Sequence, residues 1–324
     1  MSQTGAAGHP GRVVVLAGGL SHERDVSIRS GRRVSEALRQ GGFEVDELDI
    51  DAALLTSLCA DPPVCVVPLV HGEAGEDGSL REVLGLLGVP YVGTRPGACR
   101  LAFDKPVAKS IVEREGIHTA ASVALPHETF REVGAKAVMD LLIQHLGLPL
   151  IVKPNKGGSS LGCHHVRTAE ELPGAMVGCF AYGPTALVEQ HIEGTEVAVT
   201  VVDTGEGPRA LPAVGIVADE GVYDYSARYT AGQVEFITPA PLDDDVADEC
   251  ARVAVAAHQA LGLRDLSRSD LIVDPAGVPW FLEVNVAPGM TETSLVPLSI
   301  EQSDTTLTEL FSALVDQAVA RRAS

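Results

Sequence analysis

Runs of β-branched apolar residues alternate with helix-like segments along the first hundred residues. Residues 12–17 (RVVVLA) and 64–70 are continuous apolar runs, which are typical of strands buried on both faces. Residues 26–38 and 80–87 have the composition of helices. Strands that alternate with helices predict a parallel sheet in an α/β fold, with ligands bound at the carboxyl ends of the strands.

The pattern changes further along the chain. Helices are predicted at residues 105–115 and 130–146, and a buried strand at residues 149–153. After about residue 195 the chain is rich in strands, and it continues with a helix at 244–261, a hairpin and a final helix that ends near Arg321. We therefore predict three domains, 1–104, 105–195 and 196–324, with residues 1–11 as a disordered leader.

Composition excludes several classes of function. The 324 residues carry 24 basic and 44 acidic side chains, a net charge of −20, which repels nucleic acid and anionic membranes. No apolar run approaches the ~20 residues of a membrane helix. The six cysteines form no C-x-x-C pair, so we expect a cytoplasmic protein in which they are buried apolar residues.

The distribution of lysine is unusual. Arginine supplies nineteen of the 24 cations, and the five lysines all fall between residues 105 and 156. Lysine presents a compact point charge that suits phosphate, although chance alone could give this clustering. Neither a dinucleotide-binding glycine pattern nor a P-loop motif is present, so those two nucleotide folds are disfavoured.

The predicted hairpin holds the most informative group of polar residues. Arg268 and Asp270 share one face of the first strand, and Glu283 and Asn285 share one face of the second. If the turn at residues 274–277 pairs these strands, two carboxylates and an amide oxygen converge, as Mg²⁺ requires. The alternative is a polar strip with an ordinary salt bridge.

Three further positions have both a functional and a structural interpretation. Lys153 ends a buried strand and must meet an anion, and the glycine–serine loop after it could cradle phosphate or be a flexible surface loop. Glu23 could bind a ligand or simply favour the start of a helix. His71 follows a predicted parallel strand, where sites form, but a lone histidine is more often structural.

Taken together, the motifs resemble the D-alanine–D-alanine ligases of the ATP-grasp superfamily. The resemblance runs in order from about residue 12 to residue 315. Its motifs are GGLSHERDVS (18–27), HG (71–72) with GEDG (75–78), PYVG (90–93), DK (104–105), VKP (152–154) with GSSLG (158–162), residues 189–196, YDY (223–225) with RY (228–229), and LEVN (282–285) with PGMT (288–291) and SL (294–295).

The resemblance implies a three-domain ATP-grasp fold with a Rossmann-like first domain and with ATP between the second and third domains. Lys105 and Lys153 would contact the α- and β-phosphates, Glu196 the ribose, and Asp270, Glu283 and Asn285 two Mg²⁺ ions, with Mn²⁺ as an alternative metal. The remaining ATP-binding residues by resemblance are Ser160, Glu189, Gln190, Ile192 and Arg228, of which Glu189, Gln190 and Ile192 would contact the adenine.

The same resemblance assigns the chemistry. One D-alanine carboxylate would attack the γ-phosphate of ATP, and the amine of a second D-alanine would attack the resulting acyl phosphate. Arg268 and the N–H of Gly289 would stabilise the oxyanion, and Glu23, Ser159 and Tyr229 would form a hydrogen-bonded triad.

The substrates and the assembly also follow from the resemblance. Glu23 and His71 would hold the first alanine, and Ser294 and Leu295 the carboxylate of the second. Relatives that accept D-lactate change the region of Tyr229, so its presence favours an amine, and D-alanyl-D-alanine for peptidoglycan is the expected product.

The departures from the family pattern leave alternatives open. Arg228 replaces a usual lysine, Ser269 a usual apolar residue and Val286 a common threonine, which puts substrate preference and rate in doubt. The alternatives are a ligase of other D-amino acids in a specialised antibiotic-related or resistance pathway, and a catalytically inactive nucleotide-binding protein. A homodimer is expected because relatives are dimers.

Overall fold

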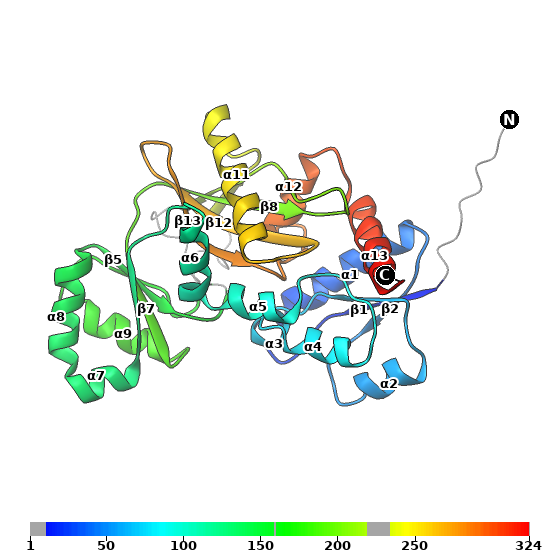
Figure 1. The fold of residues 1–324 in the computed structure, drawn as a ribbon, viewed down its shortest axis with the longest axis horizontal. Coiled ribbons are helices and arrows are strands. Elements are labelled where there is room, and N and C mark those ends of the chain that lie inside the picture. The colour runs from blue at the N-terminus through cyan, green and yellow to red at the C-terminus, as the bar shows by residue number, and fades with distance from the viewer. Residues whose placement is uncertain (1–10, 159, 219–233, 324) are drawn as a thin grey trace.

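Three β-sheets form the framework of the protein. The computed structural model describes residues 11–158, 160–218 and 234–323. Figure 1 shows the first sheet and its helices at one end, the second sheet at the other end, and the third sheet above and between them. Within the described ranges no helix is both long and apolar enough to cross a membrane.

The first sheet is parallel, as predicted. Its strands β1 (Arg12–Leu16), β2 (Glu44–Leu48) and β3 (Cys65–Pro68) lie in the order β2-β1-β3. Strand β2 was not predicted from the sequence. It is an edge strand with the sequence EVDEL, in which Val45 is buried and Glu44, Asp46 and Glu47 are exposed. The helices of this part are α1 (Arg24–Gln40), α2 (Leu54–Ala60), α3 (Glu73–Glu76), α4 (Ser79–Leu86) and α5 (Pro96–Phe103).

The second sheet is antiparallel. Its strands β4 (Ser122–Pro126), β5 (Leu150–Pro154), β6 (His164–Val166) and β7 (Thr185–Gln190) lie in the order β4-β7-β5-β6. Helices α7 (His127–Val133), α8 (Ala135–Leu146) and α9 (Leu172–Phe180) pack on this sheet. Helix α6 (Lys105–Arg114), which precedes β4 in the chain, packs mainly against β13, α5 and α11. The single helix predicted at 130–146 is wrong: Gly134 adopts φ 103°, which an α-helix cannot contain, and separates α7 from α8.

The third sheet carries the predicted hairpin. Strands β12 (Leu266–Val273) and β13 (Pro279–Asn285) pair antiparallel, and β12 also pairs with β8 (Thr195–Val202). The sheet is completed by β9 (Arg209–Ala210), β10 (Val214–Ala218) and β11 (Val234–Ile237). The helices that follow β11 in the chain are α11 (Asp244–Ala260), α12 (Leu295–Glu301) and α13 (Leu307–Ala323).

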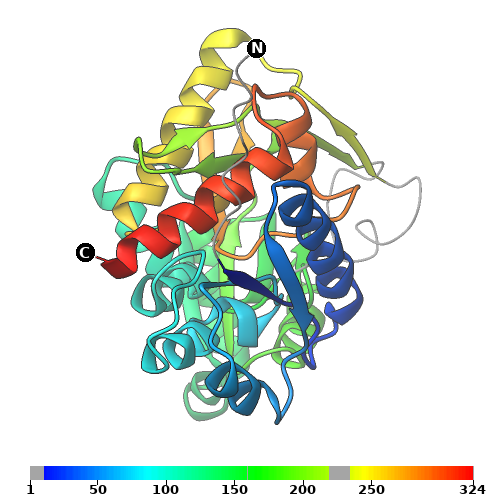
Figure 2. The ribbon, with the colours of Figure 1, turned by 90° about the vertical axis from the view of Figure 1, so that its right-hand side faces the viewer.

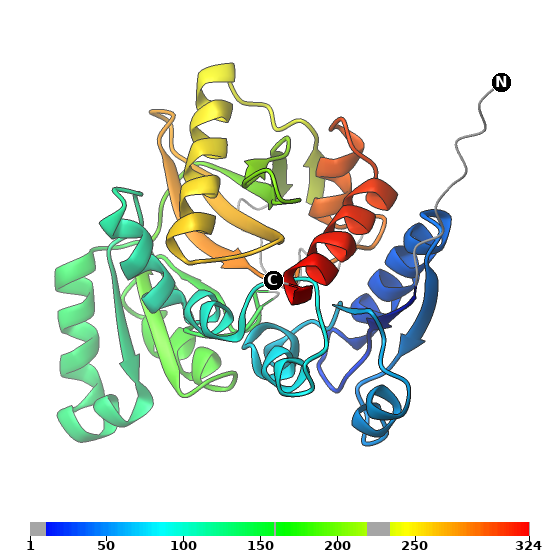
Figure 3. The same ribbon diagram turned by 45° about the vertical axis from the view of Figure 1, so that its right-hand side comes forward.

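The last helix returns to the first sheet. Leu310, Phe311 and Leu314 of α13 are buried in the same core as Val13 and Val15 of β1. Figures 2 and 3 show α13, in red, beside the N-terminal strands and α1, in blue. The two ends of the chain therefore share one core, although the division of the chain at 104 and 195 stays a prediction.

The cysteines differ in part from expectation. Cys65, Cys99, Cys179 and Cys250 are buried, but Cys59 is exposed and Cys163 is partly exposed. All six are free thiols. The expectation that every cysteine is a buried apolar residue is therefore wrong for two of them, because Cys59 lies on a surface helix and Cys163 faces a cavity described below.

One buried ion pair fastens α13 in place. Asp265 is fully buried and accepts hydrogen bonds from the Gly93 N–H (2.7 Å) and from Nη1 and Nη2 of Arg321 (2.6 and 2.8 Å). The carboxylate thus links the third sheet to the loop before α5 and to the C-terminal helix. Removing one partner from a buried ion pair leaves a charge that neither water nor a counter-ion stabilises.

We predict that Arg321→Ala lowers the free energy of unfolding by about 3 kcal/mol. The Asp265 carboxylate then stays buried without its two hydrogen bonds from Arg321, and the cation that remains near it, Arg264, has its Nε 3.8 Å away. Arg252→Ala is the matched control, since Arg252 forms an exposed ion pair with Glu249 on α11. Urea unfolding of both variants measures the difference. Equal stabilities of the two variants would show that the Asp265 pair does not fasten the helix.

Candidate active site

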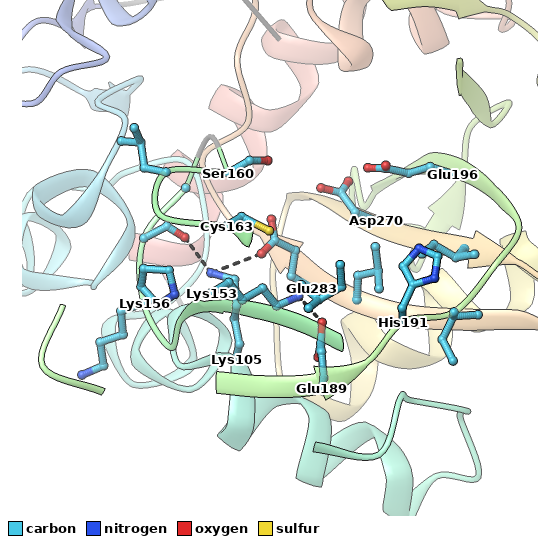
Figure 4. Close-up of a pocket in the computed structure, with 18 of the residues that line it drawn as sticks. Lys105, Lys153, Lys156, Ser160, Cys163, Glu189, His191, Glu196, Asp270 and Glu283 are labelled. Atoms are coloured by element: carbon cyan, nitrogen blue, oxygen red, sulfur yellow. Dashed lines mark hydrogen bonds and ion pairs between the residues drawn. The ribbon is translucent and has the colours of Figure 1, made fainter. Parts of the chain in front are cut away.

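A cavity lies between the second and third sheets. Its walls come from β5 and the loop after it, from β7 and the segment after it, and from the hairpin β12–β13. Figure 4 shows lysine and glutamate side chains meeting in one part of the cavity, with His191 and Glu196 in another. The predicted site residues that line it are Lys105, Lys153, Ser160, Glu189, Gln190, Ile192, Glu196, Asp270 and Glu283.

Lys105 joins the second and third sheets at the cavity wall. It is the first residue of α6, and its Nζ lies 3.2 Å from Oε2 of Glu283 on β13 and donates to the carbonyl oxygen of Gly157 (2.7 Å). Burial raises the pKa of Glu283, but Lys105 and Lys153 outweigh burial and hold that pKa at about 2. The carboxylate is therefore ionised, and in this structure a lysine neutralises it.

Lys153 meets the anion that its position on a buried strand predicts. Its Nζ lies 2.5 Å from Oε1 of Glu189 on β7, and the other carboxylate oxygen, Oε2, accepts a hydrogen bond from Nζ of Lys109. Burial would lower the pKa of Lys153, but Glu189 and Glu283 raise it above its ordinary value. Burial would raise the pKa of Glu189, but the two lysines lower it. Lys153 and Glu189 are thus stabilised in their charged forms.

The hairpin brings the predicted oxygen ligands together. Asp270 and Glu283 are partners across β12 and β13, and Asn285 lies two residues after Glu283. In this structure Nε and Nη2 of Arg268 donate to the Asp270 carboxylate (2.7 and 2.8 Å), while Asn285 Oδ1 accepts from the Ala287 N–H (2.8 Å). Two carboxylates and an amide on adjacent strands form the hard oxygen set that suits Mg²⁺.

Residues of the first sheet close the other side of the site. His71 is buried, with Nδ1 2.8 Å from the Ala287 carbonyl oxygen and Nε2 3.3 Å from Ser30 Oγ. Burial lowers the pKa of His71, and the Glu23 carboxylate acts in the opposite direction. A Cβ added to Gly158 would lie 3.8 Å from Oε2 of Glu23. Glu23 therefore stands between the first sheet and the loop after β5.

The segment after the hairpin completes this side. A Cβ added to Gly289 would lie 2.9 Å from Ser294 Oγ, so no larger residue fits there without a shift. Ser294 Oγ accepts from the Thr291 N–H (3.1 Å), and Ser294 precedes α12. The Leu295 side chain is buried among Ala198, Val214 and Ile216, so only its backbone can reach a ligand.

Some predicted residues cannot be placed, and some residues at the site were missed. Ser159, Arg228 and Tyr229 lie outside the described residues. Lys109, Glu76, Cys163 and His191 received no role from the sequence, although Cys163 and His191 line the cavity. The sequence could have indicated Lys109, because it lies four residues after Lys105 and therefore on the same face of α6.

Comparisons with known proteins agree with this geometry. The family model described as "D-ala D-ala ligase C-terminus" matches residues 111–316. A D-alanine–D-alanine ligase from Pelotomaculum thermopropionicum is 36% identical over 308 residues, covering 95% of this chain and 96% of the relative. One from Anaeromyxobacter dehalogenans is 40% identical over 286 residues, covering 88% and 90%.

Solved structures show the same architecture. A D-alanine–D-alanine ligase from Bacillus anthracis superposes with a TM-score of 0.82 at 28% identity, covering 96% of this chain and 98% of that one. The VanG D-Ala:D-Ser ligase from Enterococcus faecalis gives a TM-score of 0.82 at 26% identity, covering 95% and 99%. With the ATP-grasp fold and a family match over most of its length, the chain belongs to the D-alanine–D-alanine ligase family.

Proposed function

We propose that the protein joins two D-alanines into D-alanyl-D-alanine at the expense of ATP, for peptidoglycan precursor synthesis. The observation that carries this proposal is the cavity of a chain of this family, in which two largely buried lysines, paired with Glu283 and Glu189, lie beside the carboxylates of the hairpin β12–β13. Phosphoryl transfer depends mainly on positioning and on charge stabilisation, which this set of groups supplies. Solved relatives include a D-alanine–D-alanine ligase from Bacillus anthracis complexed with ATP.

The nucleotide would occupy the cavity between the second and third sheets. Lys105 and Lys153 would bind the α- and β-phosphates, with Ser160 and Arg228 nearby. Glu189, Gln190 and Ile192 would contact the adenine, and Glu196 the ribose. The Gln190 side chain donates to the Leu146 carbonyl oxygen (2.7 Å), so we infer that its contact with the base is made by the backbone.

Asp270, Glu283 and Asn285 would hold Mg²⁺, or Mn²⁺ in its place, as two ions that neutralise charge on the phosphates. The residues present fit these metals because all three offer hard oxygen donors at neighbouring positions of one hairpin. Lys105 now pairs with Glu283, and it must leave that carboxylate to reach a phosphate. Lys105 thus changes partner when the nucleotide enters.

The ligation would proceed in two steps. A D-alanine carboxylate, with its ammonium held by Glu23 and with His71 beside it, attacks the γ-phosphorus and releases ADP, giving an acyl phosphate. The deprotonated amine of the second D-alanine, whose carboxylate Ser294 and the Leu295 backbone receive, then attacks the acyl carbon and displaces phosphate. Arg268 and the Gly289 N–H would stabilise the oxyanion, and Glu23, Ser159 and Tyr229 would form the triad that keeps water out.

One comparison leaves a second candidate product open. The VanG protein, a D-Ala:D-Ser ligase by name, has nearly the same fold as this chain, so the fold does not decide the second substrate. An inactive nucleotide-binding protein is disfavoured because both lysines and all three oxygen ligands are present. A homodimer in the cytoplasm remains our prediction.

The proposal is tested by incubating the protein with ATP, Mg²⁺ and a panel of D-amino acids, followed by mass spectrometry of the products and measurement of ADP release. We expect D-alanyl-D-alanine as the main product. D-alanyl-D-serine as the main product would establish the second candidate. ATP binding without any ADP release that depends on amino acids would refute both.

We predict that Glu283→Gln lowers kcat by roughly 1,000-fold, because the charge that holds metal against the phosphates contributes several kcal/mol and each 1.36 kcal/mol corresponds to tenfold in rate. The circular dichroism spectrum should not change. The control for the loss of a carboxylate is Glu292→Gln, because Glu292 is exposed and follows the hairpin. Near-normal turnover of Glu283→Gln would remove Glu283 from the metal site.

Glu76 shapes the pocket expected for the first D-alanine. It is buried on α3, and its Oε1 accepts from the Gly72 N–H (2.9 Å), which fixes the loop next to His71. Burial, and next the charge of Glu23, raise the pKa of Glu76 to about 7 from 4.5. Near neutral pH about half of these carboxyls are protonated, so Glu23 supplies much of the negative charge for an ammonium group.

A raised carboxyl pKa gives a definite dependence of stability on pH. Below about pH 4.5 Glu76 is protonated in both the folded and the unfolded chain and adds no pH dependence. As the pH rises to about 7 the unfolded chain releases this proton first, which destabilises the fold. We predict that ligand-free Glu76→Gln gains stability over the wild type across this interval, by about 3 kcal/mol in total.

Urea unfolding at several pH values measures this effect. The matched control is Glu73→Gln, which removes the same charge from an exposed position of α3. If the two variants follow the same pH dependence, Glu76 is not held in its neutral form by burial.

A further inference from the structure

Three charged side chains form a buried cluster behind the proposed phosphate site. Lys109 comes from α6, Lys153 from β5 and Glu189 from β7. The Glu189 side chain is 2% exposed and that of Lys109 is 3% exposed. One carboxylate oxygen binds each ammonium group, so the two lysines share a single anion.

The cluster as a whole carries one positive charge. With Glu189 shared, Lys153 and Lys109 together exceed the carboxylate by one unit, and Lys153 is the member of the two lysines that lines the cavity. Without Lys109, Glu189 and Lys153 would form a neutral pair, and the Lys153 ammonium would be bound fully by its own carboxylate. A buried charge acts over several ångströms because protein screens it far less than water does.

We propose that Lys109 is a positioning residue for nucleotide binding: it neutralises Glu189, so that Lys153 offers its positive charge to a phosphate. This inference rests on the proposed function and extends it, since Lys109 is not among the residues that line the cavity and acts through Glu189. The ligand recognised is the polyphosphate part of a nucleotide and not its base.

Among the described residues, Glu189 is the carboxylate that lies within ion-pair distance of the Lys109 ammonium group. Burial lowers the pKa of Lys109, and Glu189 opposes this effect. Lys105, one turn earlier on α6, pairs instead with Glu283. The two lysines of this helix therefore serve two different carboxylates.

The test compares the binding of ADP with that of adenosine, measured by isothermal titration calorimetry. Lys109→Met removes the charge and keeps the length of the side chain. We expect ADP affinity to fall by roughly tenfold, with adenosine affinity unchanged, because adenosine has no phosphate. Lys109→Arg keeps the charge and should retain the ADP-to-adenosine affinity ratio of the wild type within about threefold, since arginine can also pair with Glu189.

A double variant gives the sharpest outcome. In Lys109→Met/Glu189→Gln the carboxylate is removed together with Lys109, so Lys153 again carries an uncompensated positive charge. We expect its ADP-to-adenosine ratio to be higher than that of Lys109→Met alone. The ADP-to-adenosine ratio cancels any contact of Glu189 with the base. If Lys109→Met alone does not fold, the double variant is compared with the wild type, whose ratio it should approach; a much lower ratio would then overturn the role of Lys109.

The outcomes separate this inference from the proposed function. A wild-type protein that binds no ADP would refute the proposed function itself. If the wild type binds ADP, two results would overturn the role of Lys109. One is an ADP-to-adenosine affinity ratio that does not change in Lys109→Met, including the case in which both affinities fall equally. The other is a double variant whose ratio is no higher than that of Lys109→Met.

Discussion

An ammonium group that leaves water must meet an anion or lose its proton, and this constraint organises the site. Lys105, Lys109 and Lys153 are all largely buried, and each lies within ion-pair distance of a carboxylate. The carboxylates come from β7 and β13, whereas the lysines come from α6 and β5. The ion pairs therefore join the second sheet to α6, and α6 to the third sheet, in the cavity wall where a nucleotide is expected.

The net charge of the protein makes this local arrangement necessary. At −20 the chain as a whole repels a polyanion such as ATP at long range. Attraction must come from a few cations held in a cavity, where nearby protein reduces screening by water. The confinement of lysine to residues 105–156 agrees with this requirement, because three of the five lysines form the cluster of ion pairs at the cavity.

The sequence predicted the features that depend on local pattern. Because side chains alternate between the two faces of a strand, the sequence predicted that Glu283 and Asn285 point to the same side of their strand. A short turn then pairs the two strands antiparallel, which brings Asp270 beside them. The sequence did not predict the partner of Lys153, because Glu189 lies 36 residues away and only the order of strands in the sheet makes them neighbours. The return of α13 to the first sheet was missed for the same reason.

The two lysines that we propose bind phosphate differ in the partners they would have to leave. Lys105 is paired with Glu283, which is itself a predicted metal ligand, so that pair must open when the site fills. Lys153 is paired with Glu189, whose second oxygen is already bound by Lys109, so that pair can persist. On the proposed assignment, competition for Glu283 would release Lys105, whereas Lys153 would keep its position. A site built in this way keeps a fixed positive charge for the nucleotide while the metal ligands remain neutralised until they are needed.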